Sequence, residues 1–171
     1  PASPSLPAVR ALIGAADAVL AVGTELGPTD YDMYVRGGLP DLSGMIRVDV
    51  CAEQLARHPA AVTVQGDAAE VLARLVRDVA PRRAEGAARA AAARAAARAG
   101  LDPHMPPQLA MVEAIRDAMP DAIVVGDSTQ PVYAGNLYFD APFPGAWFNA
   151  ATGYGALGYA PGAAVGAAVG S

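Results

Sequence analysis

The sequence predicts an α/β fold with a parallel β-sheet. Two observations carry this prediction: short, continuously apolar runs recur along the chain, and segments with apolar residues at helical spacing lie between them. Continuous apolar runs are typical of strands buried on both faces, as in sheets that helices cover. The alternation of strand and helix therefore favours parallel strands joined by right-handed crossovers.

The first part of the chain contains three strands and their helices. A helix is expected over 6–15, where apolar residues recur at helical spacing and Gly14 lies near the end. Apolar runs predict strands at 18–22, 45–50 and 61–65, and a short helix is expected at 51–57. Asp67 is expected to cap a helix that ends near residue 79, because apolar residues recur along one side of that segment.

Residues 81–100 differ in composition, since they are almost entirely Ala and Arg. Alanine favours helix strongly, and the arginines keep such a segment solvated. The segment has no large apolar residue to bury, so we expect an exposed helical linker. The chain then divides into three parts, which are 1–80, the linker 81–106 and 107–171.

The last part repeats the strand–helix pattern. An amphipathic helix is expected over 109–119, a buried strand over 123–125 and a turn over 126–130. Pro131 suits the first position of the next helix, where its missing N–H needs no partner. Trp147 and Phe148 indicate another short strand. Pro161 is expected to begin a final helix whose glycines share one face.

The composition argues against several functions. The net charge of −5 disfavours nucleic acid or an anionic membrane as a partner. Cys51 is the only cysteine, so no internal disulfide is expected and the cytoplasm is the expected location. No signal peptide is visible, and prolines interrupt the apolar tail after Asp140, which disfavours a membrane span. His58 and His104 lack ligand-spaced neighbours, so no metal site is expected.

Two motifs fall where open α/β sheets bind ligands. GDSTQ (126–130) follows a strand and precedes a helix, and its backbone N–H groups and hydroxyls are suited to a phosphate. The alternative is an ordinary turn with an Asp or Ser cap. GYGALG (153–158) allows a ligand to approach the backbone closely, or equally a neighbouring helix to pack there. GTELG (23–27) lacks the dinucleotide-binding fingerprint.

In this order, the segments resemble thiamine-diphosphate (ThDP) enzymes of the acetolactate synthase-like superfamily. GDSTQPVYAGNLYFD, WFNAATGYGALGYA and GAAVGAA are similar to the beginning of that family's α/β diphosphate-binding domain. AVLAVGTELGPTDYDMY and MIRVDVCAEQLARHPAAVTVQGDAAEVLARL resemble the second half of its central Rossmann-like domain. GTELGPTDYD together with GDSTQPVYAGNL is most similar to 5-guanidino-2-oxopentanoate (2-ketoarginine) decarboxylases of arginine catabolism. The resemblance covers nearly the whole chain and implies a fragment of a larger enzyme.

This resemblance implies a decarboxylase that depends on ThDP and Mg²⁺. In such enzymes the thiazolium ylid attacks the 2-oxo carbon, and CO₂ leaves while the electrons of the broken bond pass into the cofactor, which is an electron sink. Gly155 and Ala156 match the loop that grips the aminopyrimidine, with the Gly155 carbonyl accepting from its amino group. Leu157 matches an apolar wedge beneath the cofactor, usually Met in acetolactate synthases. Ser128 and Gln130 match the turn beside the diphosphate. A small 2-oxo acid substrate and a homodimer or homotetramer are also implied.

Some of the family's parts lie outside this chain. The activating glutamate belongs to an N-terminal domain, so no catalytic residue is expected here. The Gly-Asp-Gly…Asn motif that binds Mg²⁺ would follow Ser171, so no metal ligand is expected either, and the isolated chain is expected to be inactive. The family's LPAA reads PGAA at 161–164, which moves the proline by one position.

FAD, which acetolactate synthases also bind, is not expected. Glu25 stands where those enzymes carry Arg, and Cys51 replaces the second acid after Asp49. A carboxylate at that point would repel a pyrophosphate. Two other interpretations stay open: an acetolactate synthase, which is a carboligase, and a non-catalytic nucleotide-binding or structural Rossmann-like module.

Overall fold

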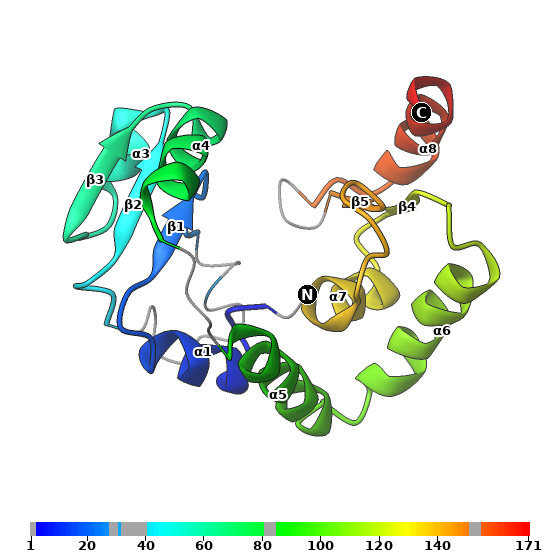
Figure 1. The fold of residues 1–171 in the computed structure, drawn as a ribbon. Coiled ribbons are helices and arrows are strands. Elements are labelled where there is room, and N and C mark those ends of the chain that lie inside the picture. Colours follow the sequence, from blue (N-terminus) through cyan, green and yellow to red (C-terminus); the bar gives the residue numbers. More distant parts are fainter. Residues whose placement is uncertain (1–2, 28–30, 32–40, 81–84, 151–154) are drawn as a thin grey trace.

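The chain contains both strands and helices, as predicted. The computed structural model describes residues 3–27, 31, 41–80, 85–150 and 155–171. Its strands form two separate parallel sheets, and a described helix joins the second strand to the third and the fourth strand to the fifth (Figure 1). The fold is therefore α/β. Within the described ranges, no helix is long and apolar enough to cross a membrane.

The first sheet has three parallel strands in the order β1–β2–β3. Its elements are α1 (Pro7–Gly14), β1 (Leu20–Val22), β2 (Ile46–Asp49), α3 (Ala52–Ala56), β3 (Val62–Gln65) and α4 (Ala68–Asp78). Each lies within its predicted range, although the strands are shorter. The predicted cap of α4 is present, because the Asp67 carboxylate accepts the backbone N–H groups of Ala69 and Glu70 at 2.9 and 3.1 Å.

The outer strands β1 and β3 are not buried on both faces, and that prediction was wrong for them, whereas the successive residues Arg47 and Val48 of the central strand β2 are both buried. Leu20 of β1 is 43% exposed and Val62 of β3 is 49% exposed. The apolar side of α4 is open as well, with Val76 largely exposed. The reason is that most contacts of described helices with the sheet come from the short α3 and from α4, which leave part of its surface uncovered.

A buried arginine joins the first sheet to its surroundings. Arg47 of β2 is 1% exposed. Its Nη1 donates to the Gln54 carbonyl at 2.6 Å, and its Nη2 donates to the Thr24 carbonyl at 2.9 Å. The Gln54 carbonyl also accepts the Arg57 N–H at 3.2 Å, so the guanidinium is its second donor. Arg47 thereby fixes both α3 and the turn after β1 to β2.

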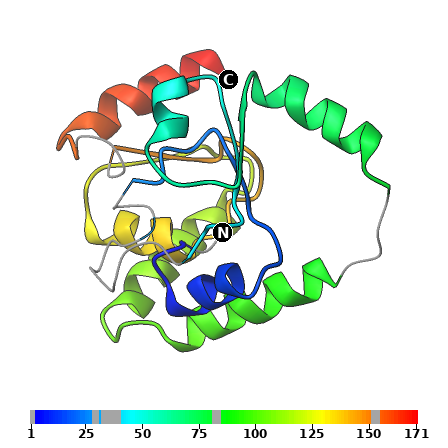
Figure 2. The same ribbon diagram turned by 90° about the vertical axis from the view of Figure 1, so that its left-hand side faces the viewer.

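The alanine-rich segment forms α5 (Gly86–Ala99), and it is helical as predicted. It is not fully exposed, however, because it lies beside α1 (Figures 1 and 2). Ala90, Ala93 and Ala97 recur at helical spacing on its more buried side, while its arginines stay exposed. Small alanine side chains let the two helices approach closely, so this segment packs without large apolar residues. The division of the chain into three parts stays a prediction.

The remaining elements are α6 (Met105–Ala118), β4 (Val124–Gly126), α7 (Gln130–Tyr138), β5 (Trp147–Asn149) and α8 (Tyr159–Gly170). Helix α6 begins earlier than predicted, at Met105. Pro106 therefore lies in its first turn, where the missing N–H of proline costs no hydrogen bond within the helix. Pro131 is the second residue of α7 rather than the first, and α8 begins ahead of Pro161. The predicted helices all form, with ends that differ by a few residues.

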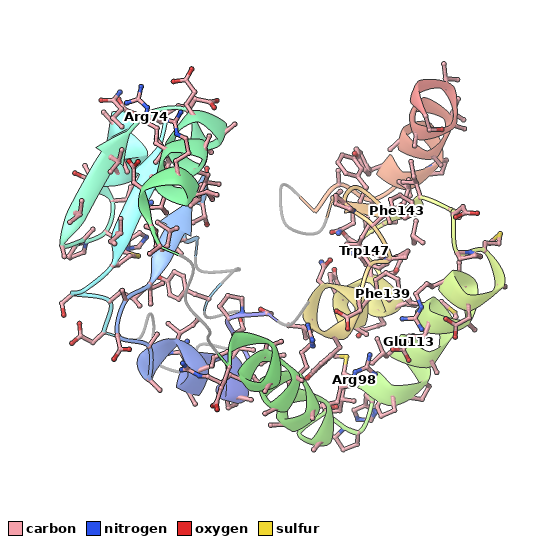
Figure 3. All side chains as sticks on the ribbon, viewed as in Figure 1. Arg74, Arg98, Glu113, Phe139, Phe143 and Trp147 are labelled. Carbon is pink, nitrogen blue, oxygen red and sulfur yellow. The ribbon has the colours of Figure 1, made fainter. Side chains whose placement is uncertain are left out.

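The main hydrophobic core lies where α1, α5, α6 and α7 meet. It is formed by Leu6, Ala97, Leu109, Val112, Ala134, Leu137, Tyr138 and Phe139. On its rim, Arg98 of α5 and Glu113 of α6 point toward one another and form an ion pair (Figure 3). The rings of Phe139 and Trp147 lie with their centroids 5.0 Å apart, so the core continues from α7 to β5. The β4–β5 sheet is therefore packed against this hydrophobic core.

Candidate functional site

The candidate site lies where β4 and β5 end. These strands pair in parallel, and Gly126 at the end of β4 is in register with Asn149 at the end of β5. Helix α7 follows β4, and the segment after β5 leads to α8 (Figure 1). In open α/β sheets, ligands bind outside the carboxyl ends of the strands. Both predicted motifs, 126–130 and 153–158, belong to this edge, although residues 153 and 154 lie outside the described residues.

Asp127 organises the turn that follows β4. Its Oδ1 accepts the Ser128 N–H at 3.1 Å, and its backbone carbonyl accepts the Thr129 N–H at 2.8 Å. Thr129 is the N-cap of α7, but its side chain makes no capping hydrogen bond. Neither Asp127 nor Ser128 caps α7, so the cap expected under the alternative of an ordinary turn is absent.

Close packing beneath the turn depends on two glycines. A Cβ at Gly126 would lie 2.4 Å from Val132 Cγ2, and a Cβ at Gly135 would lie 2.4 Å from the Trp147 ring. Real Cβ atoms almost never approach other atoms so closely. The absence of side chains at these positions lets α7 lie directly against β4 and β5.

A network of side-chain amides locks α7 to the end of β5. Asn136 Nδ2 donates to Asn149 Oδ1 at 3.2 Å, and Asn149 Nδ2 donates to Asn136 Oδ1 at 2.9 Å. The Trp147 indole N–H also donates to Asn136 Oδ1, at 2.8 Å. Because Asn149 is the last residue of β5, this network fixes the direction in which the chain leaves the sheet.

The described end of the glycine loop folds back over the turn. Gly155 has φ +62°, and Gly158 has φ +83°, which is the left-handed region that glycine adopts without strain. The Gly155 N–H donates to the Ala150 carbonyl at 3.0 Å, and the Gly158 N–H donates to Asp127 Oδ2 at 2.7 Å. A Cβ at Gly155 would lie 3.7 Å from Ser128 Oγ, so the two predicted residues face each other.

The structure brings some predicted site residues together and leaves others apart. Ser128 and Gly155 are in contact range, and the buried Ser128 Oγ has no hydrogen-bond partner among the described residues. Gln130 is exposed at the first position of α7. Ala156 and Leu157 are also exposed, with Leu157 78% accessible. The site is an open surface in this chain.

Sequence reasoning missed three residues that build this site, namely Asp127, Asn136 and Asn149. Asp127 carries the only formal charge in 126–130 and 155–158. Its position inside the turn was the signal available for it, since a carboxylate next to backbone N–H groups at a helix start is favoured. Nothing in the local spacing of the two asparagines indicates that their amides pair.

The residues considered for FAD lie in the first sheet. Asp49 Oδ1 accepts the Cys51 N–H at 2.9 Å, which turns the chain from β2 into α3. Glu25 Oε2 lies 3.5 Å from Arg57 Nη1, and both side chains are mostly exposed. Arg57 partly offsets the charge of Glu25, so repulsion of a pyrophosphate is weaker than the sequence indicates.

Two cavities lie away from this edge. One of about 440 Å³ is lined mainly by apolar residues of α1, α5 and the following loop. Another, of about 520 Å³, includes Tyr31, Asp41 and His58. Among the described residues, no group of three His, Cys, Asp or Glu side chains is placed to hold a metal ion. The described part of the β4–β5 edge is distinguished by its backbone geometry and by the Ser128 hydroxyl, which has no partner among the described residues.

One curated protein provides a direct comparison. A probable 2-ketoarginine decarboxylase of Pseudomonas aeruginosa is 40% identical to this chain over 169 residues, a match that covers 94% of the chain. The chain spans 29% of the length of that relative. No family model matches the chain, and no solved structure matches it.

Proposed function

We propose that this chain is part of a ThDP- and Mg²⁺-dependent 2-oxo acid decarboxylase that acts on 5-guanidino-2-oxopentanoate. The observation that carries the proposal is the 40% identity to a probable 2-ketoarginine decarboxylase along nearly the whole chain. The longer protein that contains the chain is called the parent protein below. We further propose that it is a cytoplasmic homodimer or homotetramer.

The residues of the β4–β5 edge fit this cofactor. The buried Ser128 hydroxyl has no partner among the described residues and faces Gly155, whose backbone conformation disfavours any side chain. Backbone N–H groups at the start of α7 lack partners within the helix and favour an anion. In the proposal, Ser128 and Gln130 lie beside the diphosphate, while Gly155, Ala156 and Leu157 contact the aminopyrimidine.

These positions assign different roles to the cofactor and to the residues of the chain. The bound cofactor supplies an electron sink for the carbanion left when CO₂ departs. The chain's own residues bind and orient: Ser128 offers a hydroxyl, Gly155 offers a carbonyl, and Leu157 offers an apolar surface. None of the described residues is assigned to proton transfer or to Mg²⁺.

The first test is decarboxylation by the purified parent protein. We expect CO₂ release from 5-guanidino-2-oxopentanoate that requires both ThDP and Mg²⁺, because ordinary side chains lack the electron sink that loss of CO₂ needs. The 171-residue chain alone should release none. A parent protein that converts pyruvate to acetolactate and leaves the guanidino acid unchanged would instead support the carboligase. If neither reaction occurs and ThDP does not bind, a non-catalytic module is favoured.

A second expected result concerns FAD. Glu25 and Cys51 replace the residues expected at a flavin site, so the purified parent protein should show no flavin absorbance. Titration of ThDP with Mg²⁺ should raise its thermal midpoint, because a ligand that binds the folded state stabilises it. Release of stoichiometric flavin on denaturation would contradict the first half, and the Glu25–Arg57 pair makes this half the weaker one.

A further inference from the structure

The Asp127 carboxylate connects two segments that are distant in the sequence. Its Oδ1 accepts the Ser128 N–H at 3.1 Å, and its Oδ2 accepts the Gly158 N–H at 2.7 Å, from a residue 31 positions away. Each oxygen therefore holds a different segment. The side chain clamps the turn after β4 to the beginning of α8.

The bond to Gly158 satisfies a donor that the helix itself does not. Gly158 is the N-cap of α8, and N–H groups at the start of a helix have no intrahelical acceptor. A carboxylate is a strong acceptor for such a group, since charge-assisted hydrogen bonds are shorter and stronger than neutral ones. Its negative charge is also favourable near a helix N-terminus.

The residues between the anchor points form the predicted cofactor loop. The Gly155 N–H is held by the Ala150 carbonyl at one end, and the Gly158 N–H is held by Asp127 at the other. Ala156 and Leu157 lie between these anchors and are themselves exposed. Because both ends are fixed, the distance between the 155–158 segment and the buried Ser128 hydroxyl is fixed as well.

We infer that Asp127 is a positioning residue, which sets the separation between Ser128 and the 155–157 segment and so presents Ser128 to the diphosphate and the 155–157 segment to the aminopyrimidine of a cofactor. The identity of that cofactor rests on the proposed function, whereas the clamp itself rests on the two hydrogen bonds. Asp127 contacts the loop and the turn, and it acts on the reaction through them.

The substitution Asp127→Asn in the parent protein separates these claims. Asparagine has nearly the same volume but keeps only one acceptor oxygen, so it can accept from the Ser128 N–H or from the Gly158 N–H but not from both, whichever way its amide is turned. The matched control is Asp121→Asn, which removes the same charge from an exposed residue before β4. Both variants change net charge equally, so a difference between them reports the clamp.

Hydrogen–deuterium exchange without cofactor tests the clamp. In Asp127→Asn, the peptide that begins at Gly155 or the peptide that contains Ser128 should exchange roughly tenfold faster, because loss of a hydrogen bond to a charged group favours local opening. In Asp121→Asn, the exchange of both peptides should match the wild type. Unchanged exchange of both peptides in Asp127→Asn would overturn the clamp, whether or not the parent protein binds a cofactor.

Cofactor titration tests the positioning role. In Asp127→Asn, the ThDP concentration for half-maximal activity should rise about tenfold or more, with little change in KM for the oxo acid. A purely structural role would lower the active fraction without moving this concentration. Faster exchange with an unchanged ThDP requirement would therefore overturn the positioning role. Faster exchange in a parent protein that never responds to ThDP would overturn the proposed function and retain the clamp.

Discussion

Replacement of Arg47 by Ala is expected to lower the free energy of unfolding by about 2–5 kcal/mol, the range found when a large buried side chain is truncated to Ala. The side chain is 1% exposed and donates to the carbonyls of Gln54 and Thr24. Its removal takes one donor from each of these carbonyls, of which Gln54 keeps the Arg57 N–H at 3.2 Å, and opens a cavity between β2 and α3. Urea unfolding of the 171-residue chain measures this loss. The wild type and the variant are compared with one common slope of the free energy of unfolding against urea concentration.

Two further variants separate the causes of that loss. Arg47→Met fills much of the volume but donates no hydrogen bond, so a loss of about 1–3 kcal/mol is expected from the carbonyls that lose this donor. Arg74→Ala removes an exposed arginine of α4 (Figure 3) and should change stability by less than about 0.5 kcal/mol. If Arg47→Ala behaved like Arg74→Ala, the buried guanidinium would have no structural role.

The elements of the fold were predictable because their signals are local. Asp67 and the apolar residues that follow it lie within one or two helical turns, so the cap of α4 could be inferred from neighbours in the sequence. The burial of the strands could not be predicted in this way. Whether Leu20 is covered depends on segments that pack from elsewhere, and an apolar run says nothing about whether they are present. Arg47 was missed for the same reason, since its acceptors lie in other segments.

The candidate site was predictable only in part. Family resemblance indicated Ser128 and Gly155, and the structure places them opposite one another. Asp127 was not singled out, because its second hydrogen bond reaches a residue 31 positions away. The pairing of Asn136 with Asn149 likewise depends on how α7 lies against β5. Contacts of this kind are set by tertiary packing, which spacing along the chain does not encode.

Leu157→Ala in the parent protein is expected to reduce turnover by about 100-fold, the loss that a misplacement of roughly 1 Å produces. The structure makes this prediction specific. Leu157 is 78% exposed, so its side chain contributes little to the core of this chain, and truncation should leave the thermal midpoint without cofactor nearly unchanged. A large loss of activity at constant stability would then come from a contact with the ligand. Turnover at saturating ThDP and the thermal midpoint are the two measurements.

Two matched variants decide whether that contact exists. Leu157→Met keeps an apolar side chain of similar volume and should retain most of the activity, since similar volume swaps are tolerated best. Leu75→Ala makes the same truncation on α4, outside the β4–β5 edge, and should leave the ThDP requirement unchanged. Unaltered turnover in Leu157→Ala would refute the wedge role. Unfolding of Leu157→Ala would show instead that other parts of the parent protein bury this residue, because the 171-residue chain leaves it open to solvent.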